Sequence, residues 1–112
     1  MGIAELMEGL DAAVVACDSE FKVVYANPRA RQAFKELLHV ENFVGNHMAV
    51  CHKPETMTKL EKLFQEYREK KKKLHHYVMD VPGGKLTVVN VPSYAGDRFT
   101  GVVEFIFEGS LA

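Results

Sequence analysis

The sequence predicts an α+β domain, with an antiparallel sheet covered on one face by helices. Short β-branched and aromatic runs bounded by turn residues occur twice before residue 27 and three times after residue 73. Between them, apolar residues recur at helical spacing. The chain has 112 residues, 47% of them hydrophobic, and a net charge of −1. This composition supports one hydrophobic core without disulfides and excludes intrinsic disorder.

The first predicted elements are an amphipathic helix and a β-hairpin. The helix covers residues 3–10, because its apolar residues follow the i, i+3, i+4, i+7 spacing of one helical face. The hairpin strands are residues 13–17 and 21–26, separated by a polar turn. We therefore divide the chain into an N-terminal helix, residues 1–11, and a single domain, residues 12–108. The apolar face of the helix consists of Ile3, Leu6, Met7 and Leu10.

Two helices are predicted in the middle of the chain. Asn27 is a good N-cap and the following proline suits the first turn, so a helix is expected over residues 28–37. Residues 38–53 are less regular. Pro54 begins a long helix that ends near the lysines of residues 70–73. Its buried stripe is Met57, Leu60, Phe64 and Tyr67.

Three strands are predicted to complete the sheet, over residues 74–81, 85–91 and 98–107. A Pro-Gly-Gly turn joins the first two strands as a hairpin. Alternation along the last strand places Val102 and Ile106 together on one face and the phenylalanines on the other. Since apolar residues occur on both faces, a helix or a second subunit is expected to cover the outer face, and Val102 and Ile106 are assigned to it.

Several function classes are excluded or disfavoured by residue patterns. Half of the basic residues fall in residues 59–73, but they end a helix, where cations complement the helix dipole, so nucleic-acid binding is not predicted. No apolar run reaches the roughly 20 residues of a membrane span, and no secretory signal begins the chain, so a cytoplasmic location is expected. No phosphate loop or nucleophile-base pair is recognisable, so no enzyme activity and no catalytic residue are predicted.

The order of elements resembles a PAS domain, the small sensory module of bacterial and archaeal signalling proteins. Residues 14–18 and 21–27 look like the first hairpin of this family, and residues 99–104 look like its last strand. Residues 45–55 are similar to a subgroup with a G-x-x-M-x-x-C-H-x-P motif that is common in multi-domain sensors. The resemblance covers about residues 5–108.

This resemblance implies a five-stranded antiparallel sheet whose inner face forms a pocket with the helices. It also implies a homodimer that pairs through the N-terminal helix and the outer face of the sheet, with Ile3, Leu6, Met7, Leu10, Val102 and Ile106 as candidates. Alternatively, the chain's own N-terminal helix covers that face and the protein is monomeric. The candidates for lining a small-molecule pocket are Phe34, His47, Met48, Cys51, His52, Met57, Tyr77, Met79 and Asn90.

The cofactor is left unknown by the sequence. His47 and Cys51 are four residues apart, but structural zinc needs four ligands, so no metal site is predicted. The Asn-Cys-Arg-Phe motif of flavin photosensors is absent, and the long helix lacks the histidine of the oxygen-sensing haem group. Haem ligation through His52 or Cys51 stays open.

Three functional hypotheses follow from the resemblance. The first is a sensory module that binds a small ligand and signals through dimer or partner contacts. The second is an interaction module without a ligand, and the third is a haem or metal redox sensor. PAS modules usually act on a kinase, cyclase or other regulator, and no such output domain is recognisable, so the chain is expected to act in trans or within a longer protein.

Overall fold

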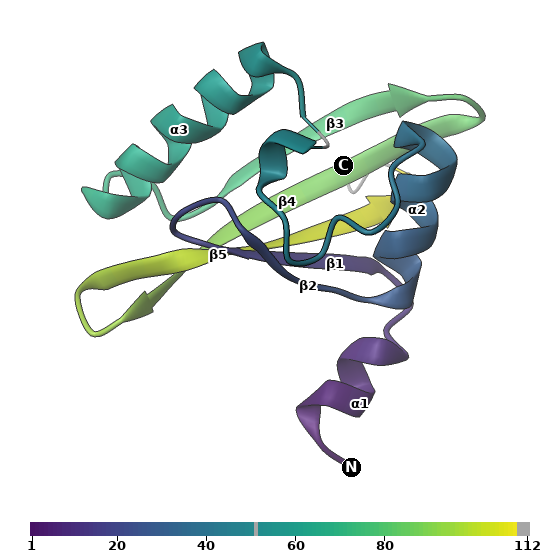
Figure 1. Cartoon of the computed structure of the whole chain (residues 1–112), viewed down its shortest axis with the longest axis horizontal. Helices are drawn as coiled ribbons and strands as arrows, with labels where there is room; N and C mark the ends of the chain where they lie inside the picture. Colours follow the sequence, from purple (N-terminus) through teal and green to yellow (C-terminus); the bar gives the residue numbers. More distant parts are fainter. Residues whose placement is uncertain (51, 110–112) are drawn as a thin grey trace.

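The computed structural model describes residues 1–50 and 52–109, so the predicted pocket residue Cys51 lies outside the described residues. The helices and strands follow the predicted order (Figure 1). They are α1 Ile3–Glu8, β1 Ala13–Asp18, β2 Val23–Ala26, α2 Pro28–Leu38, the 3₁₀ helix η1 Met48–Val50, α3 Pro54–Arg68, β3 His75–Val81, β4 Gly84–Ala95 and β5 Arg98–Glu108.

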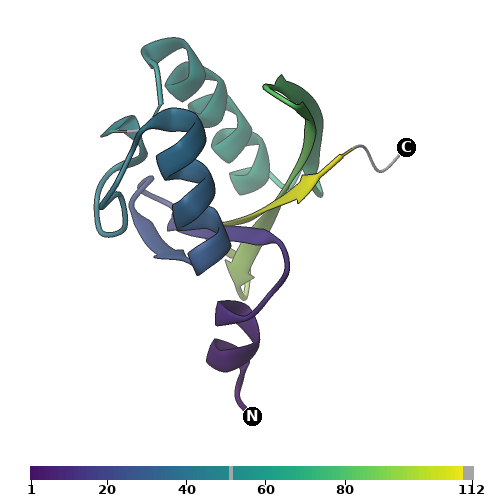
Figure 2. The same ribbon diagram turned by 90° about the vertical axis from the view of Figure 1, so that its right-hand side faces the viewer.

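The strands form one antiparallel sheet in the order β2-β1-β5-β4-β3. The N-terminal hairpin and the C-terminal strands are therefore joined through the pairing of β1 with β5. Figure 2 shows α2 and α3 on one side of the sheet, while α1 stands clear of it. This arrangement confirms the predicted fold class. None of the helices in the described part of the chain is long and apolar enough to cross a membrane.

The turn between β1 and β2 is longer than the sequence predicts. The Asp18 carboxylate accepts hydrogen bonds from the backbone N–H groups of Glu20 at 2.9 Å and Lys22 at 3.0 Å. Phe21 adopts a φ of 67°, which no strand residue has. The second strand therefore begins at Val23 instead of residue 21.

The lysine run forms the turn after α3. The helix ends at Arg68, and Lys70 has a left-handed φ of 55° with its N–H bonded to the Tyr67 carbonyl. The Lys70 ammonium lies 2.8 Å from the Asp97 carboxylate in the β4–β5 turn. These contacts support the interpretation of the run as a solvated helix end.

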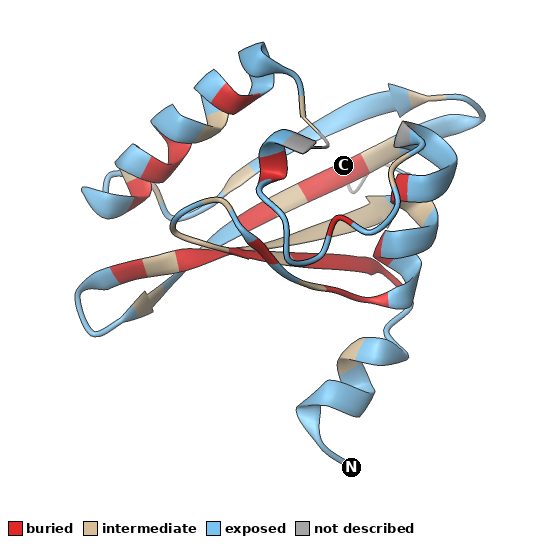
Figure 3. Ribbon diagram, in the orientation of Figure 1, coloured by how far each residue is buried: buried red, intermediate tan, exposed pale blue. Residues whose placement is uncertain are grey.

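The core lies between the sheet and the helices. In Figure 3 the buried segments follow β1, β2, the middle of β4 and the side of α3 that faces the sheet. Aromatic rings connect the layers: the Phe64 ring of α3 stacks on Phe21 at 4.3 Å and meets the edge of Phe99 at 5.3 Å. Burial of such rings is the main source of stability for this layer.

A bulge in β5 exchanges the faces of this strand. Tyr94 of β4 pairs with Phe99, but the preceding Ser93 pairs with Gly101, so Thr100 is an extra residue. The alternation predicted from the sequence therefore breaks at Thr100. Phe99 before the bulge and Val102 after it both face the core, although one is odd-numbered and the other even-numbered.

Because of the bulge, the residues of β5 that face outward differ from the predicted ones. Val102 is 3% exposed and belongs to the core, and Ile106 packs against the same core. The prediction that these two residues lie on the outer face is wrong. The residues that alternate with them, Val103, Phe105 and Phe107, face outward instead, and each is partly exposed.

Candidate functional site

The cavity nearest to the core is almost filled by side chains. Its volume is about 10 Å³, close to the volume that one water-sized probe occupies. Phe34 and Met48, two predicted pocket residues, are both buried against it, so they serve as packing. The lining is Val15, Cys17, Val23, Phe34, Met48, His52, Asn90, Val102 and Glu104.

A much larger groove opens between α3 and the inner face of β3, β4 and β5. Its volume of about 480 Å³ lies within the range of small-molecule sites, roughly 300–1,000 Å³. It shares three residues with the small cavity: His52, Asn90 and Glu104. The rest of its lining is Thr56, Lys59, Leu60, Leu63, Glu66, Lys72, His75 and Tyr77.

Three polar residues form the floor of this groove, and we call them the polar row: His75, Asn90 and Glu104. His75 of β3 is the register partner of Asn90 of β4, which is the register partner of Glu104 of β5. Directly opposed residues of neighbouring strands carry their side chains on the same face. The sheet therefore places the three side chains next to one another across three strands.

Tyr67 of α3 fixes the orientation of the Asn90 side chain. The Tyr67 hydroxyl lies 2.9 Å from Asn90 Oδ1 and 3.1 Å from the Asn90 carbonyl oxygen, and it donates to these acceptors. Asn90 Nδ2 then donates to Glu104 Oε2 at 3.4 Å. Burial raises the pKa of Tyr67 to about 12, so the hydroxyl keeps its proton at neutral pH.

The Glu104 carboxyl group, at the β5 end of the row, is partly shielded from solvent. Burial raises the pKa of its carboxyl group, and the hydrogen bond from Asn90 opposes this only in part. Oε1 of this carboxylate has no hydrogen bond within the described residues. Every fully buried side-chain oxygen or nitrogen in that part of the chain has a hydrogen-bond partner. Since Oε1 has none, it is not fully buried, and it is open to the groove.

The raised pKa means that ionised Glu104 lowers the free energy of unfolding at neutral pH. Above the ordinary carboxyl pKa of 4.5 the unfolded chain ionises Glu104 more readily than the folded chain does, so stability from this group falls as pH rises. Glu104→Gln removes this cost, and since each pKa unit corresponds to about 1.4 kcal/mol, we expect a greater free energy of unfolding at pH 7. Urea unfolding at pH 7 and pH 4 measures the change, which should shrink at pH 4. The control is Glu108→Gln at the exposed end of β5, with little change at either pH; a lower stability of Glu104→Gln at pH 7 would contradict the account.

The structure brings only some of the predicted pocket residues together. His52, Tyr77 and Asn90 line the groove, and Asn90 lies in its polar row. His47 is exposed, and its Nδ1 accepts the Ala49 N–H at 3.0 Å. The two remaining methionines are elsewhere: Met57 is buried in the core, and Met79 is 39% exposed.

Glu104 was missed by sequence reasoning. Simple alternation assigns it to the outer face together with Val102, and a carboxylate on that face is expected to be solvated. The signal that could have revealed the shift is Gly101, a glycine within a strand, which often marks a bulge.

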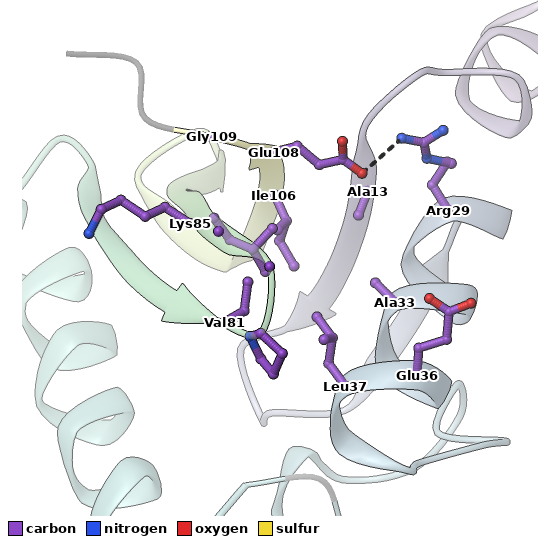
Figure 4. Close-up of a pocket in the computed structure, with 14 residues that line it drawn as sticks. Ala13, Arg29, Ala33, Glu36, Leu37, Val81, Lys85, Ile106, Glu108 and Gly109 are labelled. Atoms are coloured by element: carbon purple, nitrogen blue, oxygen red, sulfur yellow. Dashed lines mark ion pairs between the residues drawn. The ribbon is translucent and has the colours of Figure 1, made fainter.

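A second groove, of about 490 Å³, lies between α2 and the β3–β4 hairpin. Figure 4 shows Arg29 and Glu108 facing each other across one end, where their charged groups are 3.8 Å apart. Arg29 also lies 2.9 Å from Asp11. These charged groups partner each other, whereas Glu104 leaves an oxygen open, so the groove beneath α3 is the stronger candidate.

Among the described residues, no three His, Cys, Asp or Glu side chains are grouped so that they could hold a metal ion. His52 makes a hydrogen bond within its own segment: its Nδ1 lies 3.1 Å from the Met48 carbonyl oxygen. The floor of the candidate groove consists of hydrogen-bonding side chains, His75, Asn90 and Glu104.

A five-stranded antiparallel sheet in the order β2-β1-β5-β4-β3, with helices and a groove on one face, defines the α+β fold of this chain. Residues 3–108 match the sequence profile of the family described as PAS domain, so the chain belongs to the PAS domain family. The narrower motif subgroup stays a prediction. A comparison with curated proteins finds no significant match.

Several solved structures share the fold. A C-terminal domain from Streptococcus mutans superposes with a TM-score of 0.77 at 18% identity, covering 93% of this chain and 80% of that one. A sensory box sensor histidine kinase from Vibrio cholerae gives 0.64 at 11%, covering 98% and 90%. The Aer2 receptor from Vibrio cholerae, a dual PAS-haem oxygen sensor, gives 0.61 at 13%, covering 92% and 98%. At these identities the likeness shows the fold.

Proposed function

We propose that this PAS domain is a non-catalytic sensory module that binds a small organic ligand in the groove beneath α3. The observation that carries the proposal is the polar row, which places an open carboxylate oxygen on the floor of a ligand-sized groove. An acceptor that is open to the groove can receive a hydrogen bond from a donor group of a bound ligand. The family and the likeness to a sensor histidine kinase support a signalling role with a kinase-type output.

The route from the groove to the rest of the molecule runs through Tyr67. Its hydroxyl bonds to Asn90 on the floor, and its carbonyl oxygen accepts the Tyr94 hydroxyl at 2.8 Å. Both partners belong to β4, so α3 and the sheet are tied at two points along one strand. A ligand that binds one position of α3 better than another shifts the population of these arrangements.

The outer face of the sheet and α1 form the proposed dimer interface. Ile3, Leu6 and Leu10 are 69%, 53% and 37% exposed, and α1 extends away from the sheet instead of covering it (Figure 1). The helix is anchored near the outer face, because the Tyr25 hydroxyl of β2 donates to Glu8 at 2.8 Å. An exposed apolar stripe next to partly exposed strand residues is typical of an interaction surface.

We expect the double variant Leu6→Asp, Leu10→Asp to abolish dimer formation, because two charges would have to be buried against a second apolar surface. Light scattering of the purified protein measures the mass. Ala4→Asp, on the same helix but outside the stripe, serves as the control and should stay dimeric. A dimer that survives the double substitution, or a monomeric parent protein, would rule out this interface.

Native mass spectrometry of freshly purified protein, with an absorption spectrum, tests the ligand proposal. The expected result is a bound organic molecule of a few hundred daltons, released when the protein is denatured. A haem absorption band would instead favour the redox-sensor hypothesis.

The second candidate is an interaction module without a ligand. The nearly filled inner cavity, of about 10 Å³, and the exposed stripe of α1 favour it. A dimer without any bound species would support this candidate over the first.

A further inference from the structure

We infer that the edge of β3 pairs with β3 of a second copy of this chain, so that two sheets join into one continuous antiparallel sheet. This contact goes beyond the proposed function, because it depends neither on a ligand beneath α3 nor on α1. Two features of the strand His75–Val81 carry the inference: the backbone groups along its edge, and side chains that complement their own reversed order.

The two edges of the sheet differ in what covers them. At one edge, β2 is 4 residues long and a loop bonds to its outer side: the Val23 N–H donates to the Asn46 carbonyl oxygen at 2.9 Å, and the Val23 carbonyl oxygen accepts the Gly45 N–H at 2.7 Å. At the other edge lies β3, with 7 residues (Figure 1). Within the described residues, no backbone group outside β4 bonds to the backbone of β3. A long edge without a cover is a template for pairing with another strand.

The register shows which backbone groups of β3 point away from the sheet. The Gly109 N–H donates to the Lys85 carbonyl oxygen at 2.8 Å, so Lys85 directs its backbone groups toward β5 and away from β3. Asp80 is the register partner of Lys85, and it therefore directs its own N–H and C=O groups away from β4. Every second residue of the strand does the same. The outward groups are thus those of His76, Val78 and Asp80.

The strand matches its own reversed copy when the pairing is centred on Val78. In this register Val78 lies opposite the partner's Val78, and His76 lies opposite the partner's Asp80. The paired residues are the same three that direct their backbone groups outward. Each of the three pairs exchanges two hydrogen bonds, so the contact contains roughly six in all. The strand edge also contains no proline, lysine or bulge, the features that usually prevent such pairing.

Side chains on one face of this pairing are complementary in polarity. The imidazole N–H of His76 is a donor, and the carboxylate of the partner's Asp80 is an acceptor. Lys85 lies 2.6 Å from Oδ1 of Asp80 in its own chain, so the second carboxylate oxygen can accept from the partner's histidine. The two-fold symmetry repeats this contact at both ends of the strand.

Side chains on the other face are apolar. Tyr77 lies opposite the partner's Met79, which places a thioether beside an aromatic ring. Tyr77, Val78 and Met79 are 45%, 48% and 39% exposed in the single chain. Pairing removes part of this apolar surface from water, which adds to the backbone hydrogen bonds.

The contact is small, and we expect it to be weak. A strand of 7 residues contributes far less than the roughly 20–30 residues a side of a standard stable interface. Pairing should therefore occur at high protein concentration, above that at which the α1 interface is measured. A chain with both two-fold contacts can join dimers into larger assemblies.

Hydrogen exchange of single amides tests the pairing. The protein is the Leu6→Asp, Leu10→Asp variant, in which α1 does not contribute, and NMR compares its exchange rates at about 50 µM and about 1 mM. We expect exchange at His76, Val78 and Asp80 to slow about twofold or more at the higher concentration, as when half of the chains are paired. Tyr77 and Met79 should not change, because their N–H groups already face β4.

Three substitutions on the same background sharpen the test. Val78→Pro removes the central outward N–H at an edge position that tolerates proline, so it should abolish the concentration dependence. Val78→Thr keeps the N–H group and the β-branched shape, so it is the matched control and should retain the effect. His76→Asp places two carboxylates opposite each other and should abolish pairing as well. This last variant decides the matter if Val78→Pro does not fold.

The outcomes are independent of the other proposals. Exchange rates along β3 that do not depend on concentration would overturn the inference and leave the edge to a strand of another protein. Slowing at Tyr77 and Met79 instead of their neighbours would show that the register is wrong. A folded Val78→Pro or His76→Asp variant that still pairs would also contradict it. None of these results bears on ligand binding beneath α3 or on the α1 interface, which have their own tests.

Discussion

Gly101→Ala is expected to lower the free energy of unfolding by about 3–5 kcal/mol, the range of severe backbone and packing clashes. Gly101 has a φ of +150°, and a Cβ atom there would collide with the carbonyl oxygen of Cys17 and lie 2.9 Å from the Asp18 Cα. Both contacts are with the backbone of β1, which cannot swing away as a side chain can. The pairing of β1 with β5 joins the two halves of the sheet, so a clash between these strands destabilises the whole fold.

Urea unfolding followed by circular dichroism measures this loss. Gly96→Ala is the matched control, because Gly96 has a φ of +62° but open space around its missing Cβ. It should lose only about 1 kcal/mol, the cost of a left-handed alanine. Equal losses for the two variants would show that backbone strain alone matters and that the approach of β1 to Gly101 is not limiting.

Asn27→Ala is expected to cost about 3–5 kcal/mol, because it removes the partners of four buried or partly buried backbone groups. Asn27 is fully buried. Its Oδ1 accepts from Val14 N and Ala30 N, both at 3.0 Å. Its Nδ2 donates to the carbonyl oxygens of Ala12 at 2.8 Å and Met7 at 3.2 Å. One side chain thus caps α2 and connects it to both α1 and β1.

The comparison for Asn27 is Asn46→Ala, since the exposed Asn46 side chain makes one hydrogen bond within the described residues, to the Asn42 carbonyl. We expect that variant to lose less than about 1 kcal/mol. Thermal or urea unfolding of both proteins decides the matter. If Asn27→Ala is as stable as Asn46→Ala, the four hydrogen bonds of Asn27 do not hold the N-terminal segment to the sheet.

Local signals in the sequence predicted the elements well where short-range chemistry determines them. Asn27 and Pro54 mark helix starts because capping and proline geometry act within one turn, and both starts are confirmed. The face of β5 could not be predicted, because one extra residue at Thr100 reverses the parity of every residue after it.

The candidate site was only partly predictable for the same reason. Asn90 and Tyr77 belong to strands without a predicted irregularity, and both line the groove. Glu104 follows the bulge and was placed on the wrong face. Phe34 and Met48 have suitable chemistry for a pocket, but whether such side chains line a space or fill it depends on packing across the whole core, which no local pattern contains.

The most direct test of the central claim, that the groove beneath α3 is the ligand site, is to map binding over the whole surface. A chemically diverse fragment library, added to ¹⁵N-labelled protein, reports every contacted region through ¹⁵N–¹H shift changes. We predict that the changes cluster at Leu60, Leu63, Tyr77, Asn90 and Glu104. Changes that cluster instead at Ala33, Leu37 and Leu86, in the groove between α2 and the β3–β4 hairpin, would contradict the claim.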